Sequence, residues 1–297
     1  MRKIFINQLI KAATKNKKIV LIVGDLGYGV VEQFKKKFPD RFFNAGVAEQ
    51  SMAGLAAGLA LKGFHVFIYS IANFPTFRCA EQIRNDVDYH KHPVTIVAVG
   101  GGLSYGNLGY SHHAVQDYAL MRSFPNMLIA APGDPFEVRG CMRYIIENPQ
   151  PSYLRLGKAG EECFHKKIPS VKPGLWLNMK QGKKGGESIL TTGATLQIAK
   201  HLVESDSKFR EYSINSLPLW SMKNKDLQLE QVKHYSSITS IEDHLMDGGF
   251  GSWLLESLSK SPKLLSRINV NALDPSICGL VGTQAALNLA GGLSKND

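Results

Sequence analysis

The stretch AEQSMAGLAAGLAL, residues 48–61, is followed two residues later by FHVFIYS, residues 64–70. The first run is rich in small and apolar residues and predicts a buried helix, whereas the second predicts a strand. Further upstream, KIVLIV at 18–23 predicts another strand, preceded by an amphipathic helix over 3–16. This alternation of strand and helix predicts an α/β domain.

Two later apolar runs extend the same pattern. A helix over 75–90 and a strand over 93–99 are expected, and the strand contains the run TIVAV at 95–99. This run and MLIAA at 127–131 resemble strands of a parallel sheet buried on both faces, because they lack polar alternation. The first domain, residues 1–165, is therefore predicted to hold a mostly parallel sheet in three α/β layers.

A second and smaller α/β domain is expected over residues 187–297. Residues 160–186 show little sustained periodicity and contain prolines and a Gly/Lys cluster, so the linker is placed at 166–186. The strand and helix pattern then restarts. It predicts strands at 188–192, near 212–217 and near 237–242, with helices over 194–203 and from 250.

Composition limits the classes of function. The formal net charge is +10, but the lysines are scattered and lack interleaved aromatic residues, so no nucleic-acid partner is expected. No apolar run approaches the roughly 20 residues that span a bilayer, so no membrane partner is expected. The four cysteines are far apart and form no CxxC pair. These features predict a soluble protein of the reducing cytoplasm.

Familiar phosphate and metal motifs are absent from the sequence. There is no GxxxxGK[ST] or HExxH motif, and Glu32 stands where a dinucleotide fingerprint needs its third glycine. His112 and His113 follow a glycine-rich loop at 100–110, and Glu49 precedes the small and apolar helix. By themselves these residues fit either a site or ordinary roles, as solvated loop histidines and a helix-terminal acid.

The run RFFNAGVAEQSMAGLAAGLA, residues 41–60, resembles the pyrimidine-binding domain of transketolase and of 1-deoxyxylulose-5-phosphate synthase. Its GVAEQ element, at 46–50, is specific. A later run, IEDHLMDGGFGSWLLE at 241–256, looks like the opening of the family's C-terminal domain. The similarity also covers GDL at 24–26, Phe74, SHHAVQD at 111–117, SFPNM at 123–127 and APGDPFE at 131–137.

The resemblance implies a thiamine diphosphate enzyme, with roles for individual residues. Glu49 is implied to be the carboxylate that activates the cofactor through its aminopyrimidine ring, and His112 is implied to bind the sugar substrate or relay protons. Phe74 is implied to stack on the pyrimidine ring, and Phe77 to add a second aromatic contact. Asp25 and Leu26 are implied to lie near the cofactor. Arg2 and Lys158 are implied to bind the substrate phosphate.

The resemblance also implies a partner chain. In the family, a preceding domain with a GDG-type motif holds Mg2+ and diphosphate, and no such segment occurs here. Arg2, directly after Met1, matches the arginine that opens the pyrimidine-binding domain. The chain is therefore expected to be a separate C-terminal section that forms an α2β2 assembly with an N-terminal diphosphate-binding subunit. Thiamine diphosphate and Mg2+ are expected to be held mostly by that partner, with no metal site on this chain.

Several alternatives remain open at this point. Gly29 and Leu108 replace a serine and an aspartate of transketolase, which opens the substrate to a modified or nucleotide-linked sugar. Competing enzymes are the beta subunit of a 2-oxoacid dehydrogenase and a synthase that joins pyruvate to an aldehyde. His112 and the PNM element favour transketolase, which moves a two-carbon ketol unit from a ketose to an aldose. A noncatalytic regulatory partner is a further alternative, disfavoured because Glu49, Phe74 and His112 are all present.

Overall fold

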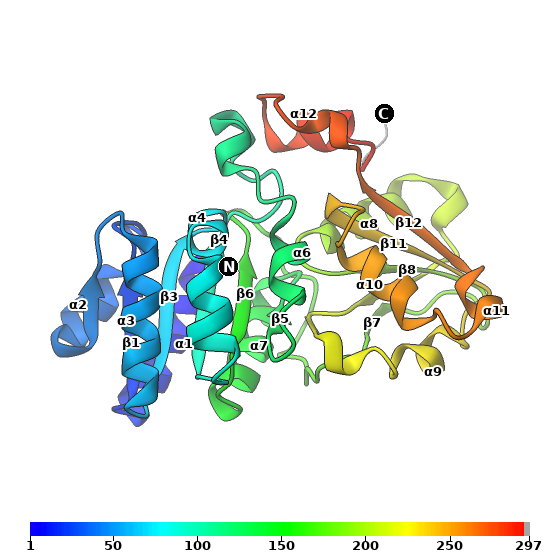
Figure 1. Cartoon of the computed structure of the whole chain (residues 1–297). Coiled ribbons are helices and arrows are strands. Elements are labelled where there is room, and N and C mark those ends of the chain that lie inside the picture. The colour runs from blue at the N-terminus through cyan, green and yellow to red at the C-terminus, as the bar shows by residue number, and fades with distance from the viewer. Residues whose placement is uncertain (294–297) are drawn as a thin grey trace.

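Two β-sheets stand side by side, each with helices packed on it (Figure 1), in the computed structural model, which describes residues 1–293. The first sheet has seven strands in the order β10-β5-β6-β4-β3-β1-β2, and the second has five in the order β12-β11-β8-β9-β7. All neighbouring strands are parallel except the pairs β10 with β5 and β7 with β9. The predicted α/β class is confirmed, with a mostly parallel sheet in the first half; the sheet of the smaller second half, for which no strand direction was predicted, is mostly parallel as well.

The strands of each sheet have the following bounds. The first sheet contains β1 (Ile19–Val23), β2 (Phe42–Asn44), β3 (His65–Ile71), β4 (Val94–Val99), β5 (Leu128–Ala130), β6 (Ser152–Leu156) and β10 (Leu219–Trp220). The second contains β7 (Leu177–Lys180), β8 (Glu187–Thr191), β9 (Ser213–Ser216), β11 (Ser237–Leu245) and β12 (Ile268–Leu273).

The helices alternate with these strands. Those of the first half are α1 (Arg2–Lys15), α2 (Glu32–Lys37), η1 (Pro39–Arg41), α3 (Glu49–Leu61), α4 (Phe74–Phe77), α5 (Ala80–Gln82), η2 (Ile83–Asp88), η3 (Gly106–Leu108), η4 (Tyr110–His112), α6 (Asp117–Arg122) and α7 (Pro135–Glu147). Those of the second half are α8 (Thr195–Ser205), η5 (Ser207–Phe209), η6 (Met222–Asn224), α9 (Gln228–Val232), α10 (Phe250–Ser257), α11 (Pro262–Leu265), η7 (Pro275–Ile277) and α12 (Gln284–Ala290).

Strand β1 shows why the first sheet needs helices on both faces. Its residues are all buried, and they alternate between two hydrophobic clusters. Val20 and Ile22 belong to the cluster that includes α3, whereas Leu21 belongs to the cluster that includes α1 and α7. Apolar runs without polar alternation are therefore explained by burial on both sides. No helix among residues 1–293 combines the length and apolar character needed to cross a bilayer.

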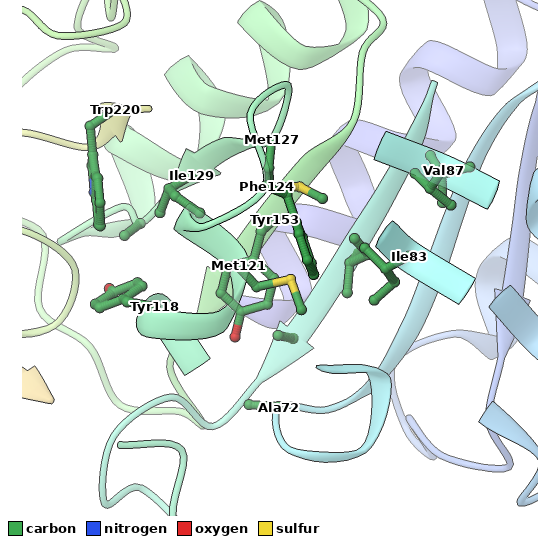
Figure 2. Packing of buried hydrophobic residues seen from close by; sticks show 14 of the residues in the cluster. Ala72, Ile83, Val87, Tyr118, Met121, Phe124, Met127, Ile129, Tyr153 and Trp220 are labelled. Atoms are coloured by element: carbon green, nitrogen blue, oxygen red, sulfur yellow. The ribbon is translucent and has the colours of Figure 1, made fainter. Parts of the chain in front are cut away.

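The helix expected over 75–90 is interrupted. Cys79 leaves the helical region with φ −123° and ψ 26°, so α4 ends before it and α5 begins after it. The chain then continues as η2, a π-helix of six residues. Its Ile83 and Val87 point into the same apolar cluster as Met121 and Phe124 (Figure 2). The apolar spacing was correct, but continuity of the helix was wrong.

Five strands were not predicted: β2, β6, β7, β10 and β12. Residues 177–180, inside the segment expected to link the domains, form β7 at the edge of the second sheet. Strand β10 comes from the second half of the chain but extends the first sheet, and its Trp220 lies beside Tyr118 and Ile129 (Figure 2). One hydrophobic cluster therefore runs through both sheets. The exact domain boundaries stay a prediction.

A buried arginine also joins the two sheets. Arg155, on β6, donates from Nε to Asp117 Oδ2 at 2.7 Å and from Nη1 to Asp243 Oδ1, on β11, at 2.5 Å. All three side chains are at most 3% exposed. Because each buried charge has an opposite partner, neither sheet can shift without leaving an unpaired charge.

Buried His65 gives the first sheet a pH dependence of its own. Burial lowers the pKa of His65 from 6.5 to about 4, and its Nε2 lies 3.1 Å from Thr95 Oγ1. A lowered folded-state pKa means that stability is lost as pH falls, because the unfolded chain takes up the proton first. We expect His65→Gln to lose this pH-dependent contribution to stability. Between pH 7.5 and pH 5 its free energy of unfolding, relative to the parent, should rise by about 2 kcal/mol.

Chemical denaturation at several pH values tests this expectation. His201→Gln, on the outer surface of α8, serves as the matched control. A difference between parent and His65→Gln that stays constant across this pH range would refute the assignment.

Candidate functional site

The candidate residues lie in loops that follow parallel strands of the first sheet. Strands β1, β2, β3 and β4 end at Val23, Asn44, Ile71 and Val99. The segments that follow them carry Asp25, Glu49, Phe74 and His112. Since the carboxyl ends of parallel strands meet at one edge, these side chains converge there, which is where open α/β sheets bind ligands.

Glu49 is the first residue of α3 and is only 3% exposed. Its helix begins there because Ala48 leaves the helical region, with φ −138° and ψ 64°. Arg78 Nη1 donates to both carboxylate oxygens at 3.1 Å. Beneath the pair, burial and the Glu49 carboxylate raise the pKa of the Cys79 thiol to about 12, so this thiol is neutral. The site thus contains a dry carboxylate with one movable counter-ion.

Phe74 connects this ion pair to the predicted substrate histidine. The guanidinium carbon of Arg78 lies 4.1 Å from the centre of the Phe74 ring, within the range of a cation–π contact. The Phe74 ring also contacts the His112 ring edge to face, with 5.2 Å between the ring centres. Glu49, Phe74 and His112 therefore form one continuous cluster, in which Arg78 is the connection to Glu49.

His112 sits on a loop that is held in place by hydrogen bonds to its backbone carbonyls. Its Nδ1 is 3.0 Å from Ser111 Oγ. Burial, His113 and Arg78 lower the pKa of His112, which favours the neutral form of the ring. Asn73 Nδ2 donates to the carbonyls of Ser111 and His113, at 3.1 and 2.8 Å. A neutral imidazole can both donate and accept hydrogen bonds, as polar substrate groups require.

Asp25 adopts a backbone conformation that is unusual for a residue other than glycine. Its φ is +55°. Asn44 stabilises this turn, because its Nδ2 donates to Asp25 Oδ1 at 2.9 Å and its Oδ1 accepts from the amides of Asp25 and Gly46. The loop after β1 is thereby tied to the segment that leads into Glu49. A strained residue held in this way at a strand end is a feature of ligand sites.

Arg2 and Lys158, the residues implied to bind phosphate, gather around Tyr105. Lys158 Nζ lies 5.0 Å from the centre of the Tyr105 ring. Burial raises the pKa of Tyr105, and the positive charge of Arg2 partly offsets this rise. The Tyr105 ring meets His112 edge to face at 6.3 Å. A patch of positive charge therefore lies next to the histidine, as an anionic substrate group would need.

Among the described residues, three further predicted ones make no hydrogen bond or ring contact with Glu49, Phe74 or His112: Asp25, which contacts Asn44 and Tyr28, and Phe77 and Leu26. Phe77 is 45% exposed, and Leu26 is half-buried after β1. Their roles at the cofactor stay predictions.

Four residues of the cluster were missed by reasoning from the sequence: Arg78, Tyr105, Asn73 and Asn44. Arg78 follows α4 directly, so its spacing of four from Phe74 was the one available signal. Tyr105 stood inside the glycine-rich loop and gave no signal of its own. Asn73 and Asn44 act through loop carbonyls and amides, and only the folded chain brings those groups within reach.

The cluster matches the chemistry of an aminopyrimidine ring better than that of a metal ion. A ring with N–H and ring-nitrogen groups can stack on Phe74 while it shares a hydrogen bond with buried Glu49. Within the described part of the chain, no group of three or more His, Cys, Asp or Glu side chains is placed to hold a metal ion. The residues present therefore fit the pyrimidine end of thiamine diphosphate.

The fold and this edge cluster define a two-domain α/β protein with its ligand site at the strand ends. The family model "Transketolase, pyrimidine binding domain" matches residues 1–160. The chain belongs to the transketolase family, which confirms the resemblance seen in GVAEQ and the motifs around it. The family uses thiamine diphosphate, and the chain is accordingly a subunit of the thiamine-diphosphate-dependent transferase type.

Individual relatives agree with this assignment. The chain is 31% identical over 269 residues to one of the subunits of an apulose-4-phosphate transketolase from Phocaeicola vulgatus, covering 88% of this chain and 84% of that protein. It is 34% identical over 277 residues to "Putative transketolase C-terminal section" of Methanocaldococcus jannaschii, covering 91% and 86%. A solved structure described as "Split gene transketolase, inactive beta4 tetramer" aligns with TM-score 0.85 and 29% identity, covering 99% of this chain and 93% of that one.

The tether from Asn73 to the His112 loop can be tested directly. We expect Asn73→Ala to destabilise the chain by roughly 1 to 3 kcal/mol, because two loop carbonyls lose their donor. Hydrogen exchange should show faster exchange over residues 106–113. Asn107→Ala, at an exposed position of the same loop, is the control. Unchanged exchange in Asn73→Ala would show that the tether does not hold the loop.

Proposed function

We propose that this chain is the C-terminal subunit of a split transketolase, which transfers a two-carbon ketol unit from a ketose to an aldose. The observation that carries the proposal is the cluster of buried Glu49, Phe74 and His112 at one sheet edge. Each of these residues has a chemical task in such a transfer. The relatives described as a transketolase subunit and as a C-terminal section support the same assignment.

The roles of the chain's own residues follow from their surroundings. Bound thiamine diphosphate supplies the nucleophilic carbon that carries the two-carbon unit. Glu49, in a position where water is excluded, would share a proton with the pyrimidine ring nitrogen. Phe74 orients the ring by stacking. His112, whose lowered pKa favours the neutral ring, hydrogen-bonds to the carbonyl or hydroxyl oxygens of the sugar.

The substrate class follows from the charge next to His112. Arg2 and Lys158, around Tyr105, are suited to a phosphate group at the far end of a sugar. A relative named for apulose-4-phosphate is consistent with a phosphorylated substrate. We therefore propose a sugar phosphate, with a modified or nucleotide-linked sugar as the variant that Leu108 and Gly29 leave open. Carbon dioxide release from pyruvate would instead identify a synthase.

A partner chain is proposed to hold Mg2+ and the diphosphate. The outer face of α3 is suited to contact another chain, because Gly54 and Gly58 face open space and Leu55 is 44% exposed. Val47, beside it, is 71% exposed, and Tyr28 and Phe77 are exposed at the same edge. Clustered apolar side chains of this kind mark protein interfaces. The relative described as an inactive beta4 tetramer supports the need for a different partner.

The catalytic proposal predicts the effect of Glu49→Gln. In the complex reconstituted with its partner, ketol transfer should fall at least about 100-fold, because the amide cannot act as the activating carboxylate. Activity is measured with a ketose phosphate donor and an aldose phosphate acceptor. Glu81→Gln, on the exposed surface of α5, is the matched control and should retain activity. Full activity of Glu49→Gln would end the catalytic assignment.

The interface proposal predicts the effect of Leu55→Glu. A charge on the outer face of α3 should prevent co-purification of the diphosphate-binding partner, while the circular dichroism of this chain stays unchanged. Leu227→Glu introduces the same charge at a similarly exposed position of the second half, and should leave the complex intact. If both variants retained the partner equally, the contact surface would have to lie elsewhere.

A further inference from the structure

We infer that Arg78 is a placeholder for the cofactor ring: its guanidinium binds Glu49 and covers Phe74, and thiamine diphosphate binds fully only after Arg78 has moved away. This inference rests on the proposed function, because it takes Glu49 and Phe74 as the pyrimidine-binding groups. It adds a regulatory contact to that site.

The first support is the pairing at Glu49. Arg78 Nη1 is 3.1 Å from both carboxylate oxygens, and within residues 1–293 no other side chain donates a hydrogen bond to this carboxylate. The Glu49 side chain is 3% exposed, so the carboxylate depends on this partner for its neutralisation. A ligand that takes the same oxygens must therefore displace the guanidinium.

The second support is the position over Phe74. The guanidinium is planar, carries N–H donors along its edge, and lies 4.1 Å from the centre of the Phe74 ring. An aminopyrimidine is also planar, and its ring nitrogen would compete for the same carboxylate by sharing a proton with it. A ring that stacks on Phe74 and reaches Glu49 needs the volume that the guanidinium fills, so the two groups compete.

The third support is the freedom of Arg78 to leave. Its side chain is 47% exposed, and among the described residues it makes no hydrogen bond except those to Glu49. The residue is the C-cap of α4 and stands directly before the break at Cys79. A rotation about its own side-chain torsions takes the charge into solvent, with no change in the backbone.

Movement of Arg78 also changes the substrate side of the site. Its positive charge contributes to the lowered pKa of His112, after burial and His113. When the guanidinium leaves, this contribution is lost and the pKa of His112 rises. Occupation of the pyrimidine position is therefore coupled to the proton affinity of the histidine beside it.

The test uses the complex of the full chain with its co-purifying diphosphate-binding partner, titrated with thiamine diphosphate at saturating Mg2+. Arg78→Met keeps the length of the side chain and removes the competing charge. We expect its Kd for thiamine diphosphate to fall about fivefold, as expected for loss of a partly exposed competing ion pair. Arg84→Met is the matched control, since Arg84 is exposed and donates to its neighbour Asn85, and its Kd should not change.

Arg78→Lys is the second variant, for the case in which Arg78→Met folds poorly. Lysine retains the charge but cannot fork and stack as a planar group, so its Kd should lie between those of the parent and Arg78→Met. The histidine signal of the full chain gives an independent readout, because the pKa of His112 should rise in Arg78→Met and stay unchanged in Arg84→Met.

The outcomes separate this inference from the proposed function. If the parent complex binds no thiamine diphosphate, both are overturned. If the parent binds the cofactor but Arg78→Met binds it equally or more weakly, the proposed function stands and the placeholder is refuted. A structure of the loaded complex with Arg78 still on Glu49 would refute it as well.

Discussion

The arrangement of both sheets depends on the buried charge cluster around Arg155. Its guanidinium binds Asp117 at the start of α6 and Asp243 on β11, and Nη2 also donates to the carbonyl of Ala114 at 2.8 Å. A buried ion pair contributes little net stability compared with apolar packing, but removal of one partner is costly. The cluster thus fixes the relative position of the two sheets more than it adds to stability.

The same cluster anchors the base of the loop that carries His112. Ala114 and Gly102 pair their backbones, with N–H to carbonyl distances of 2.9 Å in both directions, so the loop from 103 to 113 is closed at its base. Gly102 has φ +62°, and a β-carbon there would overlap Asp243 Oδ2. Only glycine therefore lets the loop base approach β11. The position of His112 therefore depends both on contacts between the two sheets at the loop base and on the hydrogen bonds from Asn73 to the loop.

Sequence reasoning succeeded where a local pattern and burial coincide. The runs at 18–23, 48–61 and 64–70 became β1, α3 and β3 nearly as predicted, because each is mostly apolar and long enough to be recognised. It failed for β2, β6, β7, β10 and β12. Strands β2, β7 and β10 have only two to four residues and so show no period, and β7 and β10 pair with strands that are distant in sequence. It also missed the break at Cys79, since the apolar spacing of 75–90 fits a continuous helix and a helix interrupted by a π-turn equally well.

The candidate site likewise contains residues that could be predicted from the sequence and residues that could not. Glu49, Phe74 and His112 could be named because each stands in a distinctive motif, whereas Arg78 has meaning only once α3 and the segment after α4 are packed together. A buried carboxylate requires compensation, and the fold provides it with a long, half-exposed side chain instead of a fixed one. A fixed partner, such as the one Asp117 has in Arg155, would hold the charge permanently. A movable partner allows Glu49 to exchange its counter-ion for a ligand. A binding site needs this exchange, whereas a structural ion pair does not.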